Sequence, residues 1–200
     1  MMLATTALAL LSLINAPFIG AAPLQMGPTL AILGGLYLAL RKWPLSTAAV
    51  ACVCGFLVLH TIGARYIYSY VPYDTWFAAI GLPQPGDLFG WQRNHYDRLV
   101  HFSFGALFTW PIAEWLNRHW QVSFGRALYI AVEFIIAVSA LYEIFEWMLT
   151  LLMASADAEA YNGQQGDFWD AQKDMALAAL GAVIVAAGLY GRARQRSQSD

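Results

Sequence analysis

Six long apolar runs, separated by short polar breaks, dominate this sequence and decide its fold class. A bilayer core about 30 Å thick needs about 20 largely apolar residues at a rise of about 1.5 Å each. The runs cover residues 2–19, 23–40, 45–64, 98–116, 127–153 and 168–190. They predict an all-α chain, a polytopic transmembrane helix bundle of about six spans.

The composition supports a membrane protein and excludes one class of partner. Of the 200 residues, 59% belong to the set AVILMFWYC and only 12% are charged, against about 45–50% and about 25% in soluble domains. The formal net charge of -2 leaves no basic excess for binding nucleic acid. We therefore expect the lipid bilayer as a partner and no nucleic acid.

The distribution of Lys and Arg between the two sides predicts the orientation, because cytoplasmic loops are enriched in these residues. With both termini cytoplasmic, the inner side holds Arg41, Lys42, Arg118, Arg126, Arg192, Arg194 and Arg196, and the outer side holds Arg65, Arg93, Arg98 and Lys173. This excess predicts one transmembrane domain over residues 1–191 and a polar cytoplasmic tail over 192–200. The first run lacks the positive n-region of a signal peptide, so we expect a retained helix.

Two outer segments differ from simple turns. Residues 66–91, between the third and fourth runs, are rich in Tyr, Trp and Phe and broken by prolines, which is typical of a membrane interface. Asp74 is the predicted N-cap of a short helix through Ile80 that lies in the interface plane. Residues 155–166 form a polar segment that leads into the sixth run.

Polar residues form a stripe on one face of each of the last three runs. Spacings of i, i+3 and i+7 place each set within about 60° of arc on a helix. The sets are Asn94, Asp97 and His101; Glu143 and Glu146; and Asp167, Asp170 and Asp174. Ala178 and Gly181 continue the last stripe and would allow close helix approach. All three stripes fall at the outer end of the predicted spans, so we expect a single cluster there.

The charge of this cluster suggests a divalent metal ion. Its six acids face four bases in the outer segments, which leaves two negative charges. The predicted metal ligands are Asp97, His101, Glu143, Asp170 and Asp174, and the predicted catalytic residues, as general base for water, are Glu146 or Asp167. Carboxylates with imidazole suit a hard or borderline cation. A proton or substrate relay and a self-satisfied ion-pair network are the two alternatives.

Three blocks of the second half carry a resemblance to a known family. They are Arg93-Asn-His-Tyr-Asp-Arg-Leu-Val-His-Phe102, Tyr142-Glu-Ile-Phe-Glu-Trp147 and Gln165-Gly-Asp-Phe-Trp-Asp-Ala-Gln-Lys-Asp174. They resemble the bacterial inner-membrane proteins typified by YjdF, a domain of unknown function. A more distant resemblance is to VanZ-type membrane proteins, although this chain has Glu146 where that pattern tends toward Gln. The YjdF-like resemblance implies a multi-pass protein of the bacterial inner membrane and supplies no activity.

The sequence is compatible with three functions. The leading hypothesis is a metal-binding cluster that acts on a lipid-linked or envelope-derived substrate. The second is a small proton- or cation-coupled transporter, in which the same acids relay protons or bind a cationic solute. The third is a non-catalytic accessory subunit whose acids pair internally or with a membrane-protein partner. The sequence does not decide whether the protein is an enzyme.

Overall fold

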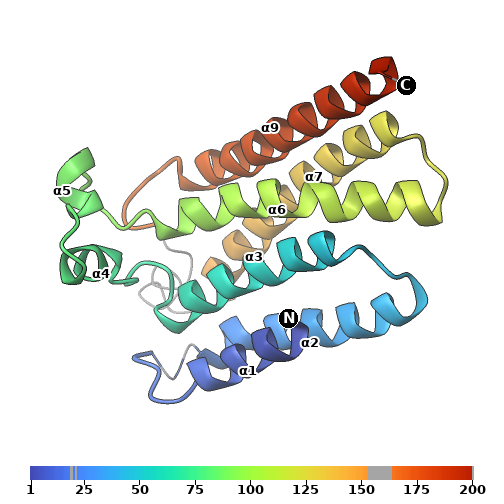
Figure 1. Ribbon diagram of the computed structural model, residues 1–200. Helices are drawn as coiled ribbons and strands as arrows, with labels where there is room; N and C mark the ends of the chain where they lie inside the picture. The colour runs from blue at the N-terminus through green and yellow to red at the C-terminus, as the bar shows by residue number, and fades with distance from the viewer. Residues whose placement is uncertain (19, 21, 153–163, 200) are drawn as a thin grey trace.

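The computed structural model describes residues 1–18, 20, 22–152 and 164–199, which form α-helices and no β-strand (Figure 1). The eight helices are α1 (Met2–Ser12), α2 (Ala22–Lys42), α3 (Thr47–Arg65), α4 (Tyr73–Ala79), α5 (Pro85–Phe89), α6 (Tyr96–His119), α7 (Phe124–Leu152) and α9 (Asp170–Ser199). The predicted all-α class is confirmed. Most of the polar segment 155–166, and Met153 at the predicted end of the fifth run, lie outside the described residues.

Three of these helices are long and apolar enough to cross a membrane. They are α3, α7 and the part of α9 from Asp170 to Arg196. With 21 and 24 residues, α2 and α6 extend for about 31 and about 36 Å. The sequence of α6 carries charged residues at both ends, among them Asp97, Arg98, Glu114 and Arg118, which lowers its hydropathy.

The first helix is shorter than the apolar run from which it was predicted. It ends at Ser12 instead of continuing toward residue 19. Asn15 adopts a left-handed conformation with φ of 51°, which commonly ends a helix, and Pro17 has no backbone N–H for a helical hydrogen bond. With 11 residues, α1 is about 16 Å long.

The helices form a bundle in which α6 is central. It packs against α9, α7 and α3, while α1 and α2 pack on α3, and Figure 1 shows these helices running back and forth with α4 and α5 at the end where α6 begins. Glycines bring α6 and α9 into backbone contact. A Cβ atom at Gly105 would overlap the carbonyl oxygen of Ala178, and one at Gly181 would overlap that of Phe102. The close approach predicted at Ala178 and Gly181 is therefore confirmed.

The segment between α3 and α6 contains the predicted short helix and a second one. The first runs from Tyr73 to Ala79, but the prediction of Asp74 as its N-cap is wrong. Asp74 lies in the first turn, and its Oδ1 accepts a hydrogen bond of 2.9 Å from the backbone N–H of Gly86. This bond links α4 to α5. The helix α5 was not predicted from the sequence, although Pro85 stands at its start and Gly90, which is left-handed, at its end.

Candidate functional site

Three helices bring the predicted polar stripes to one end of the bundle. At the end near α4 and α5, α6 and α9 begin and α7 ends (Figure 1). The side chains that face inward there are Asp97 and His101 from α6, Glu143 and Glu146 from α7, and Asp174 from α9. Asp174 has a relative exposure of only 2%, and Asp97, His101 and Glu146 are also buried. We call these five residues the buried acid cluster.

His101 lies at the centre of the buried acid cluster. Its Nε2 is 3.6 Å from Oδ1 of Asp97 and 3.7 Å from Oε1 of Glu143. These distances exceed the 2.7–3.2 Å of an ordinary N–H···O hydrogen bond. Asp97, His101 and Asp174 each offer one ligand atom, and the three atoms lie within 4.8 Å of one another. The spacing leaves room for a small ion or a water between the three side chains.

Two carboxylate oxygens of this cluster lack a hydrogen-bond partner among the described residues. They are Oε1 of Glu143 and Oδ1 of Asp174, and both atoms are buried. Most buried polar atoms in proteins are hydrogen-bonded, because leaving one unpaired in an apolar surrounding is costly. A cation with oxygen and nitrogen ligands would satisfy both atoms, and the donor set of carboxylates with one imidazole fits such a cation.

The two remaining acids of the predicted cluster lie in a separate network with three cations. Asp170 Oδ1 is 2.6 Å from Nη1 of Arg93 and 3.3 Å from Nη2 of Arg98. Asp167 pairs with Arg98, lies 3.4 Å from Arg93, and is 2.6 Å from Nζ of Lys173. We call these five residues the loop ion-pair network. Asp167 and Asp170, which the sequence grouped with the other acids, thus pair with cations, and Asp170 is itself buried beside the buried acid cluster.

The loop ion-pair network keeps Asp167 ionised. The pKa of Asp167 lies well below its usual range, chiefly because Lys173 donates hydrogen bonds to the carboxylate, with further contributions from the Trp169 backbone N–H and Arg98. His95, which immediately precedes α6, has a lowered pKa because it is desolvated and close to Arg98 and Arg93. The three cations of this network therefore favour the ionised form of Asp167 and the neutral form of His95.

Two polar contacts that the sequence analysis missed hold the loops around the site. The backbone N–H of Asn94 donates to Oε1 of Gln165 at 2.9 Å, and Nε2 of Gln165 donates to the Asn94 carbonyl at 3.1 Å. The Asn94 side chain donates to the carbonyl of Val71 at 2.8 Å. Asn94 therefore anchors the segments before α6 and before α9 to each other. Amide side chains beside the ends of helices were the only sequence signal for these contacts.

Arg65 does not compensate the acids, contrary to the charge count from the sequence. Its guanidinium donates to the carbonyls of Ser12, Ile14 and Asn15. Arg65 therefore caps the C-terminal end of α1, where the last carbonyls of a helix lack intrahelical partners.

Comparisons with known proteins agree with this membrane architecture. Residues 1–195 match the family described as "Predicted membrane protein (DUF2238)". The chain is 30% identical over 162 residues to "Inner membrane protein YjdF" of Escherichia coli (strain K12), which covers 80% of this chain and 73% of that protein. No solved structure matches the chain. The chain therefore belongs to the DUF2238 family of predicted membrane proteins.

Proposed function

We propose that the chain is a multi-pass protein of the bacterial inner membrane with six helices in the bilayer and its C-terminus on the cytoplasmic side. The inner-membrane description of its relative supports the location. Of the six helices, α3, α7 and α9 have the length and hydropathy of spans, and α2 and α6 have the length. At about 16 Å, α1 reaches about half way across the core. Short loops and ends with seven Lys and Arg on one side and four on the other support the orientation.

We propose further that the buried acid cluster binds one divalent metal ion. The observation that carries this proposal is the pair of buried oxygens, Glu143 Oε1 and Asp174 Oδ1, that have no hydrogen bond within the described part of the chain and lie near the imidazole of His101. Ligand atoms about 2.1 Å from a common ion lie about 3.0–3.4 Å from one another. The separations of 3.6 and 3.7 Å around His101 need a small contraction to reach that range, and the ligand atoms of Asp97, His101 and Asp174, which lie within 4.8 Å of one another, must also draw closer together.

The ligand set of this proposal is Asp97, His101, Asp174 and Glu143. Asp170 is left out of it, because its Oδ1 accepts from Arg93 at 2.6 Å and would have to exchange a charged partner for the metal. In this position Asp170 holds two arginines at the edge of the buried acid cluster, where they lower the negative potential around the ligands.

We propose that this centre acts on a lipid-linked or envelope-derived substrate. A bound divalent cation would supply Lewis acidity at the site. Glu146 lies three residues, or about one turn, after Glu143 and is buried, so it is the candidate proton acceptor. Asp167 has a lowered pKa and three cationic neighbours, which makes it a poor base near neutral pH. We assign Asp167 the role of positioning the side chains of Arg98 and Lys173.

Metal analysis of detergent-purified protein tests the metal centre. Wild type, Asp97→Asn and Asp174→Asn are each incubated with Zn²⁺, Mn²⁺ or Mg²⁺, freed of excess ion, and analysed for metal per chain. We expect about one ion per chain for at least one metal in the wild type and a clear loss in both variants. Asp87→Asn, at an exposed position of α5, is the matched control and should retain the metal. Absence of stoichiometric metal from the wild type, or its retention by both variants, would refute the centre.

The same unpartnered oxygens also favour the second hypothesis, a proton- or cation-coupled transporter. A buried carboxyl that lacks a fixed partner can exchange a proton or a small cation. Proteoliposomes that carry a pH gradient measure this activity directly. Transport requires a flux that Glu143→Gln abolishes, whereas a metal centre without transport leaves the vesicles as tight as empty ones. Co-purification of a second membrane protein would instead favour the accessory-subunit hypothesis.

A further inference from the structure

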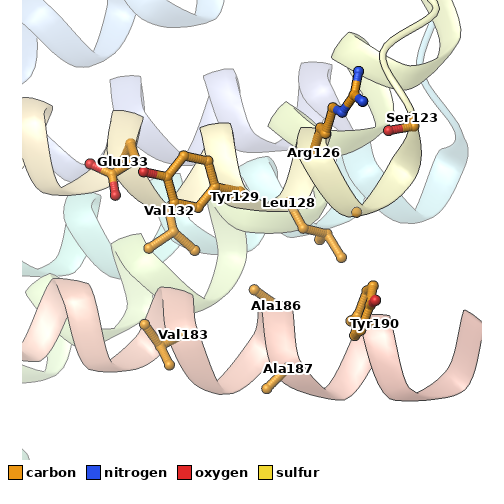
Figure 2. A pocket seen from close by; sticks show the side chains of 11 residues that line it. Ser123, Arg126, Leu128, Tyr129, Val132, Glu133, Val183, Ala186, Ala187 and Tyr190 are labelled. Carbon is orange, nitrogen blue, oxygen red and sulfur yellow. The ribbon is translucent and has the colours of Figure 1, made fainter. Parts of the chain in front are cut away.

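An open groove runs between α7 and α9, at the end of the bundle opposite the buried acid cluster. Figure 2 shows Leu128 and Val132 of α7 facing Val183 and Ala186 of α9 across it. Its volume is about 700 Å³. Both helices are candidate membrane spans, so the groove opens sideways toward lipid rather than toward water.

Apolar side chains form the floor and walls of this groove. Leu128 is buried against Ala127 and Ala131, and Ala186 packs on the same group. At the end near the α7 N-terminus, the ring of Tyr190 closes the groove by packing beside Gly125, where a Cβ atom would lie 3.2 Å from the ring. The stretch from Gly125 to Glu133 extends for about 12 Å along α7. This length and this lining fit a hydrocarbon chain.

Charges at the two ends of the groove are opposite in sign. Arg126 and the Ser123 hydroxyl lie at the end where α7 begins, and Glu133 lies about 10 Å further along the helix. Arg192 and Arg194 follow Tyr190 on α9 and are exposed at the same end as Arg126. Figure 2 shows the exposed Arg126 side chain extending from α7 on the side away from α9, so it has to turn toward the groove to contact a ligand. With that turn, an amphiphile with an anionic head fits best with its head beside Arg126 and its chain toward Val132.

We propose that this groove binds one anionic phospholipid of the cytoplasmic leaflet, with the phosphate near Arg126 and one acyl chain between α7 and α9. Basic pockets between membrane helices on the cytoplasmic side are known to bind acidic lipid headgroups. Glu133 repels the phosphate from the far end and thereby fixes the direction of the lipid. This site is independent of the metal centre proposed above, because the two lie at opposite ends of α7.

Native mass spectrometry of the detergent-purified full chain tests the lipid site. The protein is titrated with phosphatidylglycerol or with phosphatidylcholine of the same acyl chains. We expect one tightly held phosphatidylglycerol, at least fivefold more abundant than the phosphatidylcholine adduct at equal concentration. Arg126→Gln should reduce this preference to about one, and Ala187→Phe, which fills the exposed wall of the groove, should weaken both lipids.

Matched controls separate a lipid site from a general charge or folding effect. Arg118→Gln removes a 53% exposed arginine that pairs with Glu114 and should keep the preference for phosphatidylglycerol. Leu180→Phe adds the same ring to an exposed position of α9 outside the groove and should keep the lipid. Equal adducts of both lipids in the wild type, retention of the preference by Arg126→Gln, or a dimer that excludes lipid would overturn the proposal.

Discussion

His101 Nε2 and Glu143 Oε1 lie 3.7 Å apart across the interface between α6 and α7. Their side chains are 9% exposed each, so the contact is closed to solvent although the two residues belong to different predicted runs. The contact places the Glu143 carboxylate of α7 next to the candidate ligand atoms of α6 and α9.

Replacing Glu143 by Gln should weaken metal binding without unfolding the protein. The amide keeps the shape of the side chain but supplies neither the charge nor the basicity of a carboxylate. We expect the dissociation constant of the best-bound metal to rise at least tenfold, as seen when groups around metal sites are altered. Metal titration of purified protein measures this, and Glu133→Gln on the same helix is the control. An unchanged constant would remove Glu143 from the ligand set.

Gly105→Ala and Gly181→Ala should each destabilise the protein. The added methyl group would overlap a backbone carbonyl of the facing helix, and backbone cannot move aside as a side chain can. Overpacking of this kind costs about 1–3 kcal/mol. The midpoint of thermal unfolding in detergent reports it. Gly188→Ala, on α9 with no atom within 4 Å of the added carbon, should keep or raise the midpoint; an equal drop there would show that the contact is not the cause.

The loop ion-pair network should make stability depend on pH. Because the pKa of Asp167 is lowered in the folded chain, folding favours its ionised form. The stabilisation is complete above the unfolded pKa of about 3.9 and declines progressively as the pH falls from there toward the much lower folded pKa. We expect Asp167→Asn to lower the unfolding midpoint at pH 6, and the difference from the wild type to narrow steadily as the pH falls below about 4. Asp87→Asn, in exposed α5, should follow the wild type throughout; parallel curves for all three proteins would contradict the assignment.

Arg65→Met should loosen α1 while leaving the rest of the bundle folded. The variant keeps an apolar stem but removes the donors to the carbonyls of Ser12, Ile14 and Asn15. Hydrogen bonds to charged groups contribute about 1.5–3 kcal/mol. We expect faster hydrogen exchange confined to α1. Arg41→Met, which removes an exposed arginine hydrogen-bonded to Tyr37, should leave α1 unchanged, and faster exchange in α6 or α9 would place the role of Arg65 elsewhere.

The convergence of Asp97, His101, Glu143 and Asp174 could be predicted from the sequence because it follows from two regular features of a helix bundle. Helical spacing fixed which residues share a face, and the alternating direction of successive runs fixed which helix ends lie together. Both rules depend only on helix geometry, which varies little between proteins.

The pairing of Asp167 and Asp170 with arginines and a lysine could not be predicted in this way. It depends on Arg93, which lies before α6 and reaches Asp170 only because Asn94 and Gln165 hold the two loops together. The shortening of α1 has a similar origin, since the donors that satisfy its last carbonyls come from Arg65, far along the chain. Contacts between loops and distant side chains leave no periodic pattern in the sequence from which they could be predicted.

The contact of Gly105 with α9 and of Gly181 with α6 fixes which parts of the site can move. Two backbones that touch at these two points leave little room for α6 and α9 to slide or rotate past one another, so we expect the backbone positions of Asp97, His101 and Asp174 to stay fixed relative to one another while their side chains adjust. Glu143 and Glu146 are supplied by α7, which lies outside this closely packed pair. We therefore expect the space beside His101 to open to an ion or a ligand through movement of α7 and its Glu143 carboxylate rather than through movement of α6 against α9.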